Sequence, residues 1–168
     1  MATYQEHTAQ AIRNLRVLVK NNQTVNDNLD WQVTMAFYAA VHFANAHLAK
    51  TINQHYRSHA KVDEALNPYV LTNPSAFNED AYVAFGILRG LARRSRYLCS
   101  DNEANVSDAY HTIADKHFAK AIRNLDIVMH YFSNTHGYHF TQMEIKCDRI
   151  KQDKLIYFCD IVPQRVGA

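Results

Sequence analysis

The scarcity of residues that interrupt helices is the feature that most constrains this chain. Only four glycines and three prolines occur among its 168 residues, and these are the residue types that most often end helices or form turns. Between them, apolar residues recur at intervals of three and four, which is the spacing of one face of an α-helix. The sequence therefore predicts an all-α protein whose helices pack through their apolar faces.

The first two helices have recognisable starts. Thr3 and Glu6 have the spacing of a capping box, in which each side chain accepts a hydrogen bond from the other residue's backbone N–H. The helix that they start is expected to end in the polar run 21–28. Asp30 is expected to cap the second helix, which is so apolar that we place it at the centre of the molecule.

The remaining helices follow after a polar segment. One short helix and two long ones are expected over residues 61–66, 78–98 and 107–134. Gly137 is a plausible end for the last of them, since glycine readily adopts the left-handed conformation that closes a helix. Four long helices joined by short links predict an antiparallel bundle of four to five helices over residues 1–137.

Residues 138–168 form a C-terminal extension of different character. Two short runs, EIKCDRI and KLIYFCDIV, are rich in β-branched and aromatic residues, and polar Lys151 to Asp153 lie between them. Such runs on either side of a polar turn are typical of paired strands. We therefore predict a small β-hairpin packed on the bundle.

Composition argues against membranes and export. A bilayer span needs about 18 consecutive apolar residues, whereas the most apolar stretch, 33–49, contains Thr34, Asn45 and two histidines. The first residues lack the basic start and apolar centre of a signal peptide. Cys99, Cys147 and Cys159 are odd in number and share no C-x-x-C spacing, which suits reduced thiols. We expect a cytoplasmic protein with no membrane partner.

Familiar cofactor motifs are also missing. The sequence has no glycine-rich phosphate loop, no nucleophile elbow and no zinc-protease or di-iron motif, so no cofactor is expected. His55 and His59 have a spacing that zinc accepts on a helix, and His42 or His47 could add a ligand. Arg57 lies between the first two and would repel a divalent cation, so we predict no metal site.

The third long helix carries an arginine stripe. Arg89, Arg93 and Arg96 are spaced four and then three residues apart, which places them on one face, with Arg94 and Tyr97 beside them. Basic residues next to an aromatic ring can hold phosphates and stack a base of single-stranded nucleic acid. The alternative is an ordinary solvated helix face, since such faces are usually charged.

Four short motifs, taken in order, resemble the bacterial branch of the HEPN superfamily. The resemblance covers residues 5–132, and the motifs are Asp30-Trp31, Phe37-Tyr38-Ala39-Ala40-Val41-His42, His55-Tyr56-Arg57-Ser58-His59 and Ser95-Arg96-Tyr97. It implies a helical bundle that usually forms homodimers, in a superfamily of RNA-cleaving toxins, RNA-processing domains and non-catalytic binding modules. Gly86 and Gly90 lie on one stripe of the third long helix and would allow close packing in such a dimer.

The resemblance also suggests catalytic residues. Catalytic members carry an arginine and a histidine with four to six residues between them, often with a polar residue after the arginine; Arg123, Asn124 and His130 fit this pattern, with six residues between the arginine and the histidine. Histidine can transfer the proton of a ribose 2′-hydroxyl while arginine neutralises charge on phosphorus. The leading hypothesis is an RNA-directed protein, with metal-independent endoribonuclease activity in a toxin or defence system. Its partners would then be RNA and an antitoxin or another protein.

The other hypothesis is a non-catalytic module that binds a nucleotide or a protein through a basic pocket. In a bundle of this topology, the segment after the second helix would fold near the end of the third long helix. A cationic pocket with one aromatic wall is then expected from His55, Arg57, His59, Arg96 and Tyr97. The structural alternative is that Arg57 pairs with Asp63 or Glu64 and that the histidines cap helix ends.

Overall fold

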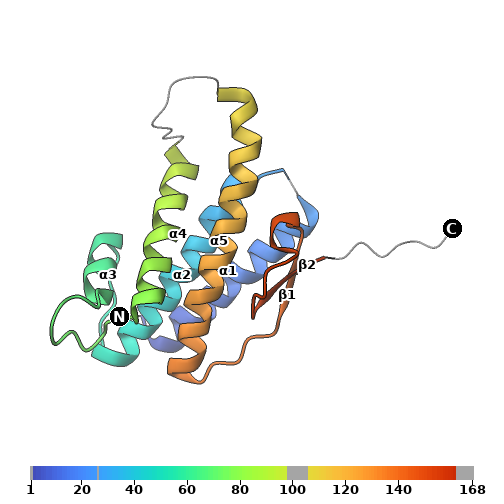
Figure 1. Cartoon of the computed structure of the whole chain (residues 1–168). Helices are drawn as coiled ribbons and strands as arrows, with labels where there is room; N and C mark the ends of the chain where they lie inside the picture. Colours follow the sequence, from blue (N-terminus) through green and yellow to red (C-terminus); the bar gives the residue numbers. More distant parts are fainter. Residues whose placement is uncertain (1, 26, 98–105, 162–168) are drawn as a thin grey trace.

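A computed structural model describes residues 2–25, 27–97 and 106–161, with the backbone alone described for residues 97 and 106–113. Five α-helices make up most of this part of the chain (Figure 1): α1 (Tyr4–Thr24), α2 (Leu29–Ile52), α3 (His59–Leu66), α4 (Glu79–Tyr97) and α5 (Val106–His136). The prediction of an all-α bundle is confirmed. Gly137 ends α5 with a φ of 67°, and its N–H donates to the carbonyl of Ser133.

α2 is the central helix, as predicted. It contacts each of the other four helices, and most of its side chains are buried. The large core residues Phe37, Phe43 and Leu48 are completely buried on it. Between residues 31 and 48 of α2, few side chains remain available to solvent, and these few are informative about function.

The helix starts agree only partly with the sequence pattern. The capping box of α1 is present, with the Thr3 N–H 2.8 Å from Glu6 Oε2 and the Glu6 N–H 3.2 Å from Thr3 Oγ1. The prediction that Asp30 caps α2 is wrong, because the cap position is Asn28. Asp30 lies inside the first turn, where the helix dipole favours a carboxylate without a capping bond.

The short helix α3 begins earlier than the sequence pattern indicated. It was expected from residue 61, but its first residue is His59 and its cap residue is Ser58. This difference of one half-turn matters because it attaches His59 to a helix that packs on α2. The histidine is thereby held in a fixed position instead of moving with a loop.

The strands of the extension are present, but the hairpin prediction is wrong. β1 (Met143–Ile145) and β2 (Phe158–Asp160) run parallel, with Met143 opposite Phe158 and Ile145 opposite Asp160. A hairpin reverses the chain at a tight turn, whereas here the link contains the 3₁₀ turn η1 (Asp148–Ile150) and crosses over before β2.

Buried polar groups fasten this extension to the bundle. Asp126 of α5 accepts hydrogen bonds from the N–H groups of Ile156 and Tyr157, at 3.1 and 2.7 Å. Burial raises the pKa of Asp126, against the effect of these two bonds. Near the other end of the chain, Asn22 of α1 accepts the N–H of Lys146 at 2.6 Å. The link between the strands therefore has bonding partners on α1 and α5, which explains why it does not close as a hairpin.

An aromatic cluster joins the extension to the core. The ring of Phe140 lies 5.4 Å from Phe43 and 5.1 Å from Tyr157, measured between ring centres. Phe132 lies 4.9 Å from Phe43 and 6.0 Å from Tyr138. The extension is thus part of the same apolar core as α2 and α5. Its two cysteines, Cys147 and Cys159, are free thiols, and Cys99 lies outside the described residues.

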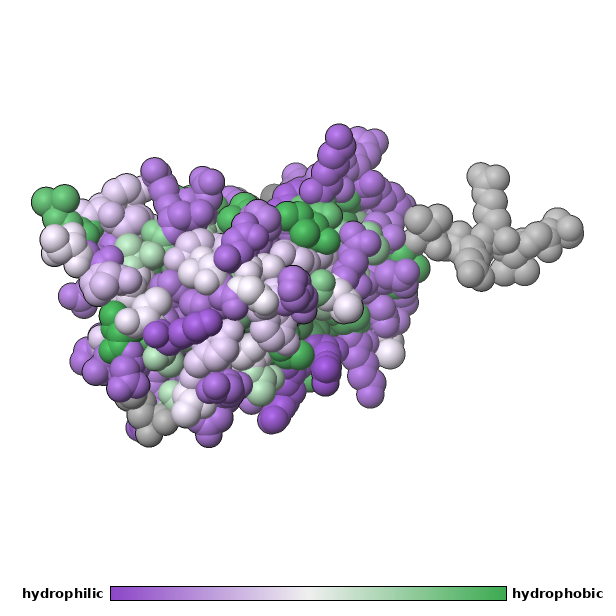
Figure 2. Space-filling model, turned by 90° about the horizontal axis from the view of Figure 1, so that it is seen from below, coloured by the Kyte–Doolittle hydropathy of each residue, from purple (hydrophilic) through white to green (hydrophobic). Residues whose placement is uncertain are grey.

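The face of the molecule at the lower end of the bundle is mainly hydrophilic (Figure 2). Seen from the lower end of the bundle, hydrophobic residues occupy small, separate areas (Figure 2). None of the described helices combines the length and the apolar character needed to cross a bilayer.

Candidate functional site

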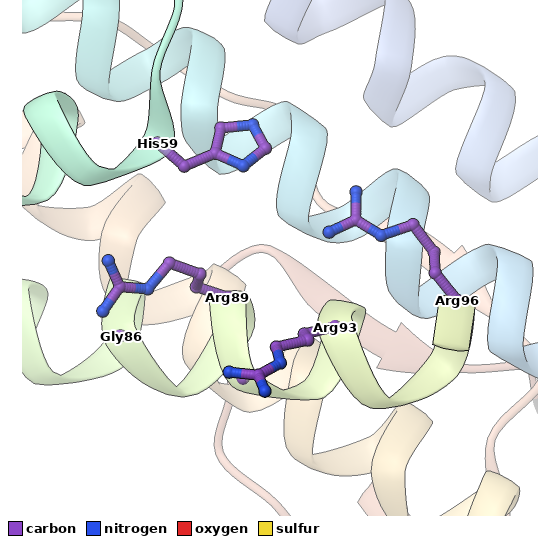
Figure 3. A pocket seen from close by; sticks show the side chains of 6 residues that line it. His59, Gly86, Arg89, Arg93 and Arg96 are labelled. Carbon is purple, nitrogen blue, oxygen red and sulfur yellow. The ribbon is translucent and has the colours of Figure 1, made fainter. Parts of the chain in front are cut away.

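A cationic cavity lies between α4 on one side and α2 with α3 on the other. Its volume is about 390 Å³, and it is lined by His59, Gly86, Arg89, Gly90, Arg93 and Arg96. In Figure 3 the guanidinium group of Arg96 extends from α4 toward the ring of His59. The arginine stripe and His59, one histidine of the pair His55 and His59, therefore meet at one site.

The two glycines of α4 give the cavity its width. A Cβ atom built on Gly86 or on Gly90 would meet no other atom within 4 Å. No other segment of the described chain packs against them, and the close packing in a dimer that their spacing suggested stays a prediction. Instead, the missing side chains leave open space between the arginines, which is available to a ligand.

Two of the arginines have protein partners that fix their position. Arg89 pairs with Asp63 of α3 at 3.2 Å. Arg96 donates from Nη1 to the hydroxyl of Tyr38 at 3.2 Å, and its guanidinium carbon lies 5.8 Å from the centre of that ring. Arg93 between them is exposed. The cavity thus combines two positioned guanidinium groups with one that is open to solvent.

His59 is held among aromatic rings. The centre of its ring lies 5.1 Å from that of Phe37 and 5.9 Å from that of Tyr38, both edge to face. Burial lowers the pKa of His59, and the positive charges of Arg96 and Arg89 lower it further. Because its pKa lies below the ordinary value of 6.5, His59 is neutral at pH about 7, and a bound anion would favour its protonation.

His55 lies in a different cluster from His59. Its Nδ1 is 3.1 Å from Nε2 of His7, whose Nδ1 is in turn 3.2 Å from Nδ1 of His42. Burial lowers the pKa of His7 to about 4, with further contributions from His42 and His55. The result is a hydrogen-bonded row of three imidazoles between α1, α2 and the segment before α3.

The other members of the predicted pocket are placed differently. Arg57 is exposed and does not line the cavity. The alternative pairing of Arg57 with Asp63 is not seen, because Asp63 binds Arg89. Tyr97 is the last residue of α4, and its side chain lies outside the described part of the structure. Of the five predicted residues, the cavity brings together His59 and Arg96.

Arg123, Asn124 and His130 lie on α5, away from this cavity. Arg123 donates from Nε to Asp153 at 2.6 Å and from Nη2 to the carbonyl of Arg149 at 2.6 Å, and both acceptors belong to the extension. Asn124 is buried and donates to the carbonyl of Lys120. His130 is exposed, with Nε2 3.0 Å from the amide of Asn134. Arg123 therefore has a structural role, because its hydrogen bonds hold the extension against α5.

Sequence reasoning placed His59 near Arg96 but did not bring Arg89 and Arg93 of the arginine stripe into the same pocket. The link between α2 and α3 is short and returns the chain to the side of α4. This link is the sequence feature that could have placed His59 beside the whole arginine stripe. Tyr38 was noted only as part of a motif, and His7 was not considered at all. Nothing local marks His7, because its partners are 35 and 48 residues away in sequence.

No three His, Cys, Asp or Glu side chains within the described ranges are arranged to bind a metal ion. No protein-family model matches the chain, and no curated protein and no solved structure shows significant similarity to it.

Proposed function

We propose that this protein binds RNA, and that the cavity of His59, Arg89, Arg93 and Arg96 holds a phosphate group of the RNA backbone. The observation that carries the proposal is that three arginines of α4 line one space, with no carboxylate among the residues that line it. The proposal agrees with the RNA-directed function that the resemblance to the HEPN superfamily implies. Homodimer formation and an antitoxin or other protein partner stay predictions from that resemblance.

Arginine is the side chain best suited to this task. A guanidinium group can donate two parallel hydrogen bonds to phosphate oxygens and stays charged at any physiological pH. A divalent cation would instead be repelled by the same groups, and neutral His59 alone would offer it one ligand. The cavity therefore selects an anion, and the flexible phosphate backbone of RNA provides a row of them.

The proposal predicts that Arg93→Ala weakens the binding of a single-stranded RNA by about 10- to 100-fold, since a hydrogen bond to a charged group contributes about 1.5–3 kcal/mol. Arg94→Ala is the matched control, because Arg94 is the next residue of α4, is exposed and does not line the cavity. Fluorescence anisotropy of a labelled oligonucleotide at two salt concentrations measures both variants. Equal effects of the two substitutions would contradict the proposal.

RNA cleavage by the protein is a second prediction. Incubation with labelled RNA in EDTA tests it, and a metal-independent enzyme would leave a cyclic or 3′ phosphate. If cleavage is found, His130→Ala is expected to reduce it about 10²- to 10⁴-fold, because His130 would be the acid or base. Undiminished cleavage would exclude Arg123 and His130 as the active site. Intact RNA would support the non-catalytic binding module, which the engagement of Arg123 by Asp153 already favours.

A further inference from the structure

Between residues 31 and 48, the exposed side of α2 is a narrow stripe of three rings and one methionine next to the arginine cavity. Between residues 31 and 48 of α2, every side chain is buried except those of Trp31, Met35, Tyr38 and His42. They are spaced four, three and four residues apart, so they lie in one row. Trp31 is 57% exposed and Tyr38 is 38% exposed. A tryptophan this exposed on the central helix of a bundle is not explained by packing within the described part of the chain.

Tyr38 connects this stripe to the cavity. Its hydroxyl accepts a hydrogen bond from Arg96, and its ring meets the edge of His59. Both of those residues line the cavity. The stripe therefore passes the cavity at Tyr38 and continues along α2 to Trp31. The two exposed rings lie seven residues apart, which is about 10 Å along the axis at a rise of about 1.5 Å per residue.

We infer that the ligand is single-stranded RNA, with a phosphate in the arginine cavity and bases of the same strand stacked on Tyr38 and Trp31. The inference rests on the proposed function and specifies its substrate class. Positive groups that follow the backbone beside aromatic rings that stack bases are the combination that single strands require. Duplex RNA cannot use the rings, since its bases are stacked on one another inside the helix.

Charge complementarity favours RNA over a protein partner. A protein segment that covered the stripe would bring apolar groups to Trp31 and Met35, and it would also have to satisfy the guanidinium groups at the same edge. RNA can satisfy both the stripe and the guanidinium groups, because every nucleotide carries a flat base that can stack on a ring and an anionic phosphate that can bind arginine. The arginines that would bind phosphate lie on α4, and the rings that would stack bases lie on the adjacent helix α2.

Trp31 allows a direct measurement, because it is the only tryptophan of the chain. Its fluorescence is recorded during titration with a single-stranded RNA of about ten nucleotides, within the usual range of site sizes. Titrations with an abasic ribose-phosphate oligomer of equal length and with duplex RNA follow. The single strand is expected to quench the fluorescence, whereas the abasic oligomer binds at the cavity without quenching.

Affinities of two variants complete the test. Trp31→Ala is expected to weaken single-strand binding by about 5- to 100-fold, the effect of losing one stacked base, and to leave binding of the abasic oligomer unchanged. Tyr69→Ala is the matched control, since Tyr69 is 63% exposed and lies outside the stripe. It should change neither affinity.

The outcomes separate the two proposals. If the single strand and the abasic oligomer bind equally, without quenching and without an effect of Trp31→Ala, stacking on the stripe is refuted while phosphate binding stands. If none of the three nucleic acids binds, both proposals fail. Quenching by a protein from the same cell in the absence of RNA binding would assign the stripe to a protein partner and would overturn the inference.

Discussion

Lowering the pH from about 7.5 to about 5 is expected to destabilise the protein, with about 2 kcal/mol of the loss due to His47 alone. His47 is 2% exposed, and burial lowers its pKa from 6.5 to about 4. Its Nε2 lies 3.2 Å from the carbonyl of Ser75, to which it donates, and its Nδ1 lies 3.1 Å from Nε2 of His136. The neutral form is therefore the one that the folded protein accommodates.

The direction follows from the two pKa values of His47. Above pH 6.5 the ring is neutral in both the folded and the unfolded chain, so its contribution to stability is complete. Between pH 6.5 and about 4 the unfolded chain binds a proton that the folded protein does not, so stability falls as the pH falls. His7 and His136, whose pKa values are also lowered to about 4, act in the same direction.

Urea unfolding at several pH values measures this effect. His47→Gln is expected to be less stable than the wild type at pH about 7.5, because contacts are lost, but to lose about 2 kcal/mol less on going to pH about 5. His139→Gln, at an exposed position, is the control and should follow the wild type. Parallel pH profiles of wild type and His47→Gln would show that His47 is not the titrating group.

Truncation of Phe132 is expected to produce the largest effect of a single substitution, with Phe132→Ala lowering the free energy of unfolding by about 3–5 kcal/mol. Phe132 is 1% exposed and contacts rings from three parts of the chain: Tyr4 of α1, Phe43 of α2 and Phe140 of the extension. No single neighbour can move to fill the resulting cavity, because each is held by a different element.

Thermal and urea unfolding test this prediction. A loss of this size corresponds to a fall in Tm of about 6–20 °C for a chain of this length. Ile127→Ala, on the same helix but 40% exposed, should cost about 1 kcal/mol or less. Similar losses for Phe132→Ala and Ile127→Ala would mean that the aromatic cluster does not hold the extension to the bundle.

The helices could be predicted from sequence because their signals are local. The Thr3 capping box and Gly137 lie within a few residues of the helix ends that they define. The pairing of β1 with β2 is different, since its direction depends on contacts of the intervening link with Asn22 and Asp126, far away in sequence. A run of β-forming residues indicates a strand but carries no information about its direction.

The same distinction applies to the candidate site. Arg89, Arg93 and Arg96 could be grouped by helical spacing, and His59 could be placed near Arg96 from the expected topology. The separation of His55 from His59 could not be predicted, because it depends on His7 of α1. The structural use of Arg123 was equally hidden, since its acceptors on Asp153 and Arg149 follow from the path of the extension.

The bond between Asn22 and Lys146 also has a consequence for how the chain folds during synthesis. The two residues are 124 positions apart, so at about 5–20 residues per second the partner of Asn22 is made about 6–25 s later. α1 can pack on α2 long before then. During that interval the amide of Asn22 has Gln32 of α2 as its remaining partner, at 2.9 Å. Closure of the fold between its first helix and its last strands must therefore be a late event on the ribosome.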